Sequence, residues 1–278
     1  MRVDGQEIAQ KIFNDLKQRV DKLKGKGITP HLHIITLTSN FASKVYVSQK
    51  KLKGKRIGAK ITVENLDPQI TTQDLLKKIH KLNNDSSIHG VIVQRPLPFQ
   101  IDEKKTAEAI NPRKDVDGFH QYSDFSPPVG ISVLKILEKI YNSFEENLNF
   151  EGWLKSKKIT VVGGGITAGK PIIKTLVRIG VKPLTVASQT QNRAEILKNS
   201  DIIICAVGKP NILTKSDIKK GAILVGVGMF MGKDGKFHSD YEEEDIKDTA
   251  SFYTPTPGGV GPVNVAELLS NLLNATEN

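Results

Sequence analysis

The chain has very little cysteine, few aromatic residues and no long hydrophobic run. Cys205 is the only cysteine among 278 residues, so no internal disulfide can form, which is typical of proteins in a reducing compartment. No apolar stretch approaches the ~20 residues that span a bilayer. The first ten residues, MRVDGQEIAQ, contain no apolar signal core. We therefore expect a cytoplasmic protein with no membrane partner.

Clustered metal ligands and nucleic-acid-binding motifs are also lacking. His31 and His33 alternate on one predicted strand, but no further cluster of His or Cys supplies the other ligands, so we expect no metal site. There is no RNA-recognition aromatic motif, zinc-finger spacing or basic tail. The formal net charge of +10 favours an anionic partner, and we expect a phosphorylated cofactor or a polycarboxylate substrate rather than nucleic acid.

Hydrophobic periodicity predicts alternating helices and strands. Apolar residues recurring on one face predict helices over 5–24, 71–82 and 264–274. A further helix is predicted within 42–57, where no proline or other helix breaker occurs, and another over 132–144, after Pro127 and Pro128. Short apolar runs predict buried strands over 31–37, 60–64, 90–94, 158–162, 183–187, 201–207 and 222–227. This alternation is typical of an α/β fold with parallel sheets, in which ligands bind at the carboxyl ends of the strands.

The length of 278 residues suits two domains, each with its own core. We predict an N-terminal three-layer α/β domain, residues 1–125, and a Rossmann-type NAD(P)-binding domain, residues 126–261, with a cleft between them. The C-terminal helix, within residues 262–278, is expected to pack back on the first domain.

Three polar residues, Ser43, Tyr46 and Lys50, stand at i, i+3 and i+7 of a predicted helix that Asn40 is placed to cap. A hydroxyl, a phenol and an ammonium therefore share one face, which could hold a flat anionic ligand. A lysine-rich surface helix with a half-buried tyrosine has the same pattern, so the spacing alone leaves both interpretations open.

Gln94 ends an otherwise apolar strand, just before Arg95 and Pro96, where ligands of a parallel sheet bind. A glutamine that only hydrogen-bonds the following turn fits the pattern equally well. Asp117, which precedes Gly118, is either a turn residue or a second side chain in the same cleft.

A glycine-rich loop follows the apolar strand 158–162. Read as G-x-G-x-x-A over residues 163–168, it meets the dinucleotide-binding fingerprint, because a strand precedes it and a helix follows. The residues that we expect at the pyrophosphate are Gly163, Gly164, Gly165, Ile166 and Thr167. The free N–H groups and the positive dipole end of the next helix favour a phosphate there.

The next strand of this unit ends in Ser188, Gln189 and Thr190, without the acidic residue that usually binds the ribose of NAD. Hydroxyls at Ser188 and Thr190, with Arg193 just beyond, suit a 2′-phosphate, so we favour NADP over NAD. Gly208 follows a further buried strand and is expected to face the cofactor. Cys205, within that strand, is expected to be a core residue.

Together these residues resemble a known family, the bifunctional methylenetetrahydrofolate dehydrogenase/methenyltetrahydrofolate cyclohydrolases of the FolD type. The resemblance covers nearly the whole chain. The segments that carry it are Ser43–Lys50, Gly90–Pro98, Lys114–Phe119, Ala206–Pro210 and Pro257–Pro262. Five segments in the right order are far more specific than any one alone, and they favour a ligand-binding role for Tyr46 and Lys50 over a surface helix.

The resemblance implies hydride transfer from 5,10-methylenetetrahydrofolate to NADP, then hydrolysis to 10-formyltetrahydrofolate. It implies that Lys50 moves the proton of the hydrolytic step, that Gln94 holds Lys50, that Tyr46 stacks on the p-aminobenzoyl ring and that Asp117 accepts hydrogen bonds from the pterin. The implied substrate-binding residues also include Ser43, Pro96, Leu97, Pro98, Pro257, Gly258 and Gly259, and Val207 joins the cofactor site. The neighbouring Lys44, Lys51, Lys53 and Arg56 are expected to lower the pKa of Lys50.

The chain departs from the family pattern mostly on the cofactor side, where Gly164 and Gly165 replace an Arg-Ser pair and Ala187 replaces a histidine. These departures bear on whether the enzyme uses NADP or NAD. The resemblance also implies a homodimer, and the basic surface suits the glutamate tail of a folate. Two other interpretations are a shikimate-type NAD(P)-dependent dehydrogenase and a basic nucleic-acid-binding protein.

Overall fold

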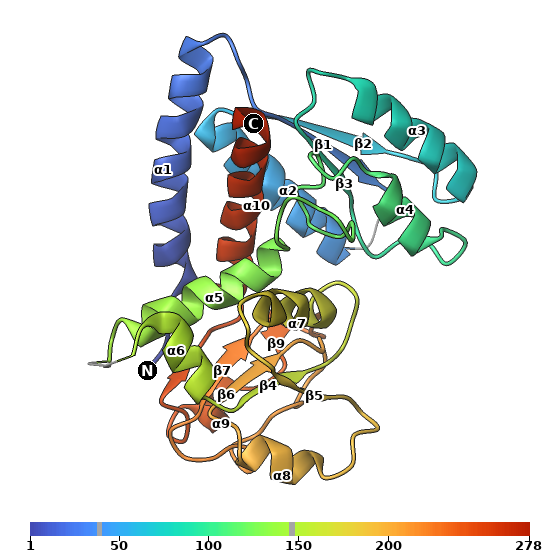
Figure 1. Cartoon of the computed structure of the whole chain (residues 1–278). Helices are drawn as coiled ribbons and strands as arrows, with labels where there is room; N and C mark the ends of the chain where they lie inside the picture. The colour runs from blue at the N-terminus through green and yellow to red at the C-terminus, as the bar shows by residue number, and fades with distance from the viewer. Residues whose placement is uncertain (38–40, 145–147) are drawn as a thin grey trace. The chain divides into compact units, whose positions relative to one another are not determined.

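The computed structural model of the chain describes residues 1–37, 41–144 and 148–278. The chain forms two compact α/β units (Figure 1). One unit contains Gln10–Pro128 and Val265–Asn278, and the other contains Met1–Ala9 and Val129–Asn264. Asn40, the predicted helix cap, lies outside the described residues. No helix of the described ranges is both long enough and apolar enough to cross a bilayer.

The unit containing Gln10–Pro128 is built on a sheet of three parallel strands in the order β2-β1-β3. The strands are β1 (His31–Thr36), β2 (Lys60–Asn65) and β3 (Gly90–Val93). Figure 1 shows α3 (Thr72–Asn84) and α4 (Glu103–Ala109) on one face of the sheet, and α1 (Gly5–Gly25), α2 (Phe41–Ile57) and α10 (Val260–Glu277) on the other. The predicted three-layer α/β arrangement is confirmed for this unit.

Alternating side chains in β1 explain the two covered faces. Ile35 packs into a core with Leu75 and Ile79 of α3. On the other face α2 packs closely on β2, because a Cβ at Gly54 would lie 2.5 Å from the Ile61 side chain. This close packing fixes the height of α2 over the sheet, and with it the position of the polar face of α2 at the carboxyl end of β3.

The other unit contains five parallel strands in the order β10-β7-β6-β4-β5. The strands are β4 (Ile159–Val162), β5 (Leu184–Val186), β6 (Ile202–Cys205), β7 (Ile223–Gly226) and β10 (Phe252–Tyr253). Counted from β4, the order is 2-1-3-4-5, one of the two common doubly wound arrangements, whose switch point lies between the first and third strands. Here that point lies between β4 and β6.

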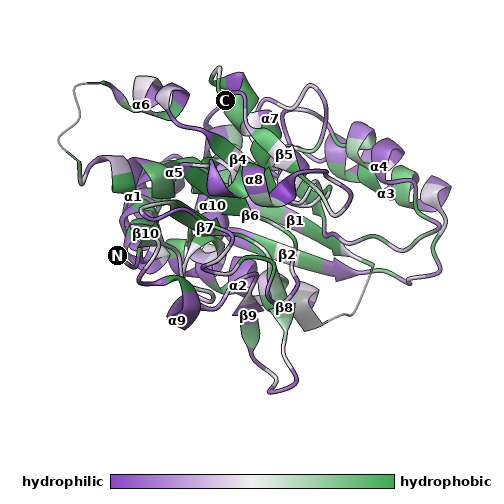
Figure 2. Ribbon diagram, turned by 90° about the horizontal axis from the view of Figure 1, so that it is seen from below, coloured by the Kyte–Doolittle hydropathy of each residue, from purple (hydrophilic) through white to green (hydrophobic). Residues whose placement is uncertain are grey.

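Helices cover both faces of this sheet. One core includes side chains of α5 (Pro128–Tyr141), α6 (Phe150–Ser156) and α7 (Gly169–Arg178), and the opposite core includes side chains of α8 (Arg193–Lys198) and α9 (Glu243–Ile246). Figure 2 shows β4 and β6 as hydrophobic and α9 as hydrophilic, as expected for central strands buried on both faces and a surface helix. An antiparallel hairpin, β8 (Met229–Met231) and β9 (Phe237–Ser239), follows β7.

Candidate active site

Lys50 is directed from α2 to the carboxyl end of β3. Its side chain is buried, with a residue exposure of 5%, and its Nζ donates a 2.9 Å hydrogen bond to Gln94 Oε1. The Gln94 Nε2 donates a 2.9 Å hydrogen bond to the carbonyl oxygen of Arg95. Because that second bond fixes which way the amide faces, Gln94 presents its oxygen, and not its nitrogen, to the lysine.

Burial lowers the pKa of the Lys50 ammonium, and the negative charge of Asp117 opposes this shift. The direction of the shift is as expected, but the expected cause is wrong. Lys44, Lys51 and Arg56 are exposed, and the Lys53 ammonium lies 5.5 Å from the centre of the Phe13 ring. Desolvation, and not repulsion from neighbouring cations, therefore disfavours the charged form of Lys50.

Ser43 and Tyr46 share the helix face of Lys50, as their spacing predicts. Ser43 is buried, and its hydroxyl donates a 3.4 Å hydrogen bond to the carbonyl oxygen of Arg95. Tyr46 is half-buried, and burial raises the pKa of its phenol, so the phenol stays protonated. A flat ring and a polar hydroxyl are thus presented beside the Lys50 amine.

Asp117 lines a small, mostly apolar pocket that also contains the charged side chains of Arg95 and Asp115. The pocket is lined by Arg95, Asp115, Asp117 and Phe119 together with apolar residues of β3 and α4. The Arg95 guanidinium lies over the Phe119 ring at 4.2 Å from its centre, and its Nη1 lies 2.9 Å from the carboxylate of Glu103.

Asp115 and Arg95 are functional candidates that sequence reasoning missed. Asp115 is buried, its carboxylate accepts a 2.7 Å hydrogen bond from the backbone N–H of His120, and burial raises its pKa. Two features of the sequence could have indicated them: Asp115 begins the Asp-Val-Asp-Gly segment, and Arg95 lies within the Gln-Arg-Pro segment. Both residues hold the loop that carries Asp117 and Phe119.

The three residues after Arg95 have different environments. Leu97 packs against the core between β3 and α3, whereas Pro96 is exposed and Pro98 is half-buried. The Arg95–Pro96 peptide is cis. Only part of this predicted substrate-binding segment is therefore open to a ligand, and Leu97 has a structural role as well.

In the other unit, the glycine turn joins β4 to α7. Gly163 has φ +96°, and a Cβ there would lie 2.6 Å from the carbonyl oxygen of Ala206. A Cβ at Gly169 would lie 1.9 Å from the carbonyl oxygen of Gly163, so Gly169, and not Ala168, is where the helix packs most closely. Gly164 and Gly165 have open space around them, as does the exposed Ile166. These positions are available to a pyrophosphate.

The other predicted cofactor residues lie at the ends of the strands that flank β4. Ser188 and Gln189 are exposed, while the Thr190 hydroxyl accepts a 2.8 Å hydrogen bond from the backbone N–H of Ala187. The Arg193 guanidinium donates a hydrogen bond to the carbonyl of Ile212. Val207 lies against the glycine turn, because a Cβ at Gly163 would come within 3.0 Å of its side chain.

The segment Pro257–Gly259 has a clear structural role. Gly258 accepts a 2.9 Å hydrogen bond from the backbone N–H of Gly5, and a Cβ at Gly5 would lie 1.8 Å from the carbonyl oxygen of Gly259. The start of α1 is therefore seated on this segment. Cys205 is buried and burial raises the pKa of its thiol, in agreement with the core role expected for it.

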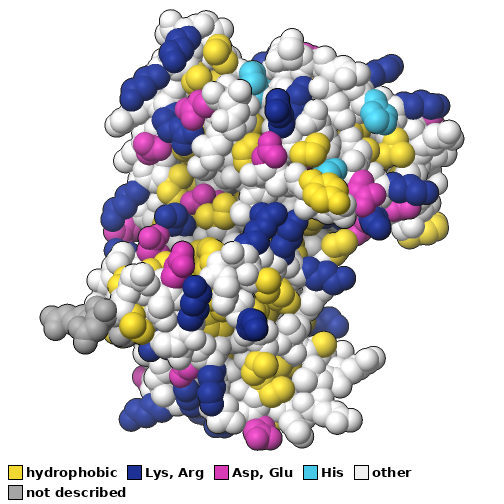
Figure 3. All heavy atoms as spheres, viewed as in Figure 1, with side chains coloured by type: hydrophobic (Ala, Val, Ile, Leu, Met, Phe, Trp, Pro, Cys, Tyr) yellow, Lys and Arg dark blue, Asp and Glu magenta, His cyan; other side chains and the backbone are white. Residues whose placement is uncertain are grey.

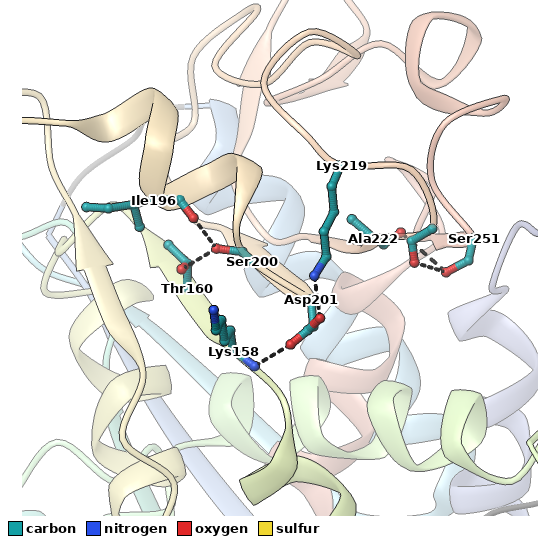
Figure 4. A network of polar contacts seen from close by, with 9 residues as sticks. Lys158, Thr160, Ile196, Ser200, Asp201, Lys219, Ala222 and Ser251 are labelled. Carbon is teal, nitrogen blue, oxygen red and sulfur yellow. Dashed lines mark hydrogen bonds and ion pairs between the residues drawn. The ribbon is translucent and has the colours of Figure 1, made fainter.

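A second polar cluster lies at the opposite ends of β4 and β6 and takes no part in these sites (Figure 4). Asp201 accepts a 2.6 Å hydrogen bond from the backbone N–H of Lys158 and pairs with Lys219, and Thr160 contacts Ser200 at 2.7 Å. Burial acts to raise the pKa of Asp201, but these partners outweigh it and the pKa is lowered. The cluster joins the amino-terminal ends of the strands, opposite the edge that carries the glycine turn.

No group of three or more potential metal ligands is found among residues 1–37, 41–144 and 148–278. On the face seen in Figure 3, Lys and Arg side chains are spread over both units, with Asp and Glu among them. The charge pattern on that face therefore offers no single basic stripe of the kind that follows a nucleic-acid backbone.

Comparisons with known proteins identify the family of the chain. Residues 3–117 match the family described as tetrahydrofolate dehydrogenase/cyclohydrolase, catalytic domain, and residues 145–278 match the NAD(P)-binding domain of the same family. The chain is 38% identical to the bifunctional protein FolD of Staphylococcus carnosus, over 98% of this chain and 95% of that protein.

Solved structures give the same result. The FolD methylenetetrahydrofolate dehydrogenase/cyclohydrolase of Campylobacter jejuni is 33% identical with a TM-score of 0.91, covering 100% of this chain and 99% of the other. The Trypanosoma brucei enzyme, solved with NADP and an inhibitor, is 27% identical with a TM-score of 0.89, covering 100% and 97%. A shikimate dehydrogenase from Aquifex aeolicus, 16% identical with a TM-score of 0.51 over 87% and 97%, shares the fold alone.

Proposed function

Because the chain belongs to the tetrahydrofolate dehydrogenase/cyclohydrolase family, and is a bifunctional enzyme of that family, we propose that Lys50 moves the proton of its hydrolytic reaction. The observation that carries this proposal is the buried Lys50 amine, with its lowered pKa, hydrogen-bonded to Gln94. An ordinary exposed lysine stays charged near neutral pH, so it is a poor base.

The dehydrogenase reaction needs alignment more than proton transfer. A hydride leaves the methylene carbon that bridges N5 and N10 of tetrahydrofolate and reduces the nicotinamide. The methenyl cation that remains is stabilised by both adjacent nitrogens. The protein's contribution to this step is therefore to bind and orient the folate and the dinucleotide.

The cyclohydrolase reaction does need proton transfer. Water adds to the methenyl carbon, and the neutral Lys50 amine takes one of its protons. The resulting ammonium returns that proton to N5 as the bond between the carbon and N5 breaks. The second proton of the water leaves to solvent as the carbinol oxygen becomes the formyl carbonyl, which gives 10-formyltetrahydrofolate. Gln94 supports both states, because its amide oxygen accepts a hydrogen bond from amine or ammonium.

We assign the folate to the face formed by α2 and the end of β3. Tyr46 supplies a flat ring for the p-aminobenzoyl group, and Ser43 lies one helical turn before it. Asp117 supplies a carboxylate acceptor for the N–H donors of the pterin. Pro96 and Pro98 follow Gln94 at the same strand end. For Pro257, Gly258 and Gly259, which belong to the other unit, we propose a role in substrate binding because the family resemblance implies it.

The dinucleotide is assigned to the glycine turn, with its pyrophosphate at Gly163–Thr167 and the N-terminus of α7. The cofactor is NADP, as in the related Trypanosoma brucei structure. We propose that its ribose phosphate is bound by Ser188, Gln189, Thr190 and Arg193. NAD is kept as the comparison cofactor in the assay, because Gly164 and Gly165 stand where the family usually has an Arg-Ser pair.

We further propose that the enzyme acts in the cytoplasm as a homodimer and accepts folates with extended glutamate tails, for which the net charge of +10 is favourable. Light scattering of the purified protein tests the dimer. Comparison of the KM for mono- and polyglutamylated substrate tests the tail.

A spectrophotometric assay with methylenetetrahydrofolate tests the function. We expect reduction of NADP, with a larger kcat/KM than for NAD, and separate hydrolysis of methenyltetrahydrofolate without any dinucleotide. Turnover of shikimate with no turnover of methylenetetrahydrofolate would overturn the proposal in favour of the fold relative.

A further inference from the structure

Asp240 holds the loop that follows β6. Its side chain is fully buried at the end of the β8–β9 hairpin, and its carboxylate accepts hydrogen bonds from three consecutive backbone N–H groups. The distances are 3.0 Å from Val207, 2.6 Å from Gly208 and 2.9 Å from Lys209. Hydrogen bonds to an ionised acceptor are stronger than neutral ones, so this buried charge is well compensated.

The surroundings of Asp240 are shaped to admit the carboxylate. A Cβ at Gly228 would lie 2.0 Å from Asp240 Oδ2 and 2.4 Å from the backbone nitrogen of Gly208. Gly208 itself has φ +76°, a conformation that other residues rarely adopt. Side chains at either position would displace the loop or the carboxylate.

The three hydrogen bonds also orient the opposite side of the loop. The peptides of Val207–Lys209 are trans, so each carbonyl points away from the N–H of its own peptide plane. The carbonyl oxygens of Val207 and Gly208 therefore point away from Asp240. Because their N–H partners are fixed, these two oxygens are fixed hydrogen-bond acceptors.

The strand order indicates what these acceptors face. The loop 207–209 follows β6 and lies against the glycine turn after β4. β5, whose end bears the residues assigned to the adenosine ribose, lies on the other side of β4. A dinucleotide with its pyrophosphate at the glycine turn therefore extends its nicotinamide half toward the β6 side. The carboxamide and ribose of that half carry N–H and O–H donors.

We infer that Asp240 is a positioning residue for the nicotinamide half of the cofactor: it orients the Val207 and Gly208 carbonyls that receive it. Asp240 does not itself touch the cofactor in this arrangement. The inference rests on the proposed NADP site, and the experiment below separates the two.

The test compares binding of NADP with binding of 2′,5′-ADP, which lacks the nicotinamide half. Asp240→Asn keeps the size of the side chain but removes the charge and turns one acceptor into a donor. We expect the Kd for NADP to rise about tenfold, with the Kd for 2′,5′-ADP and the cyclohydrolase kcat/KM each within about twofold of the parent enzyme. Asp234→Asn, an exposed change in the same hairpin, should leave all three values unchanged.

Gly228→Ala is the second variant, because it crowds the carboxylate while leaving Asp240 in place. It should weaken the binding of NADP without weakening the binding of 2′,5′-ADP. If Asp240→Asn does not fold, the result for Gly228→Ala tests the inference. Parent-like NADP affinity in the folded variants, or an equal loss of NADP and 2′,5′-ADP, would overturn the inference. Failure of the parent enzyme to bind NADP would instead overturn the proposed function.

Discussion

The Lys50 amine and the Gln94 side-chain oxygen lie 2.9 Å apart in a buried setting, although 44 residues separate them in sequence. The pairing depends on two independent elements, a helix face and a strand end, that the fold brings together. Its chemical result is a lysine that gives up its proton more readily than usual while staying fixed in position.

The pH dependence of hydrolysis should report this lysine. Because burial lowers the pKa of Lys50 from 10.5, the neutral amine becomes available below that value, and kcat for the cyclohydrolase should rise with pH through an apparent pKa under 10.5. Asp117→Asn removes the negative charge that opposes the shift, so its profile should move to lower pH. Rates must be corrected for uncatalysed hydrolysis. Identical profiles for parent and variant would contradict the assignment.

Asp117→Ala should separate the two ligands. Removing the carboxylate deletes the proposed acceptor for the pterin. A hydrogen bond to a charged group contributes about 1.5–3 kcal/mol, so the KM for methylenetetrahydrofolate should rise roughly tenfold or more. The KM for NADP should change by less than about twofold, because Asp117 belongs to the other unit. Steady-state kinetics with each substrate varied in turn would measure both, and a larger effect on NADP would remove Asp117 from the pterin site.

Asp201→Asn should affect stability and not activity. The carboxylate pairs with Lys219 and with the Lys158 backbone at the amino-terminal ends of the strands. We expect the variant to lose about 1–2 kcal/mol in free energy of unfolding; the effect is limited because the Asp201 side chain is 32% exposed, so solvent screens the ion pair. Urea denaturation would measure it, with Asp248→Asn, an exposed change in the same unit, as the control. An equal loss in both variants would contradict the role of the cluster.

The same cluster has a predictable pH dependence. The pKa of Asp201 is lower in the folded protein than the usual value of about 3.9, so its stabilisation is complete above that value. The stabilisation is lost as the pH falls from about 4 through the folded-state pKa. The difference in unfolding free energy between parent and Asp201→Asn should therefore shrink over that range.

Gly164→Arg should improve discrimination between cofactors. A Cβ at Gly164 meets no atom within 4 Å, so the fold admits a side chain there. Because β4 pairs with β5, a long guanidinium side chain at this turn would add positive charge beside the end of β5, where the 2′-phosphate that only NADP carries is assigned. We expect the ratio of kcat/KM for NADP to that for NAD to rise severalfold. A ratio that stays the same or falls would place the 2′-phosphate away from this turn.

Much of the ligand-binding edge follows from the sequence. The i, i+3, i+7 spacing places Ser43, Tyr46 and Lys50 on one helix face, and the apolar run before Gln94 places that residue at the end of a parallel strand. These are local patterns with a strong period. Helices such as α4, α6, α8 and α9, with 7, 7, 6 and 4 residues, are too short to show one, and no prediction covered them.

Other features depend on contacts that no local pattern encodes. The lowered pKa of Lys50 is caused by burial. The sequence, with several lysines near Lys50, instead suggested repulsion between positive charges as the cause. The close packing at Gly169 depends on the three-dimensional path of the glycine turn, which no local sequence pattern encodes. Asp240 acts on a loop about 30 residues earlier through a hairpin that periodicity did not predict.

The most direct test of the account is the cyclohydrolase rate of Lys50→Met, measured with methenyltetrahydrofolate beside Lys51→Met, which changes the exposed neighbour on the same helix. We expect the Lys50 variant to lose hydrolysis by about 10²–10⁴-fold while NADP affinity stays within about twofold, and the Lys51 variant to keep both. A Lys50→Met enzyme that hydrolyses its substrate at the parent rate would contradict the central role of the buried amine.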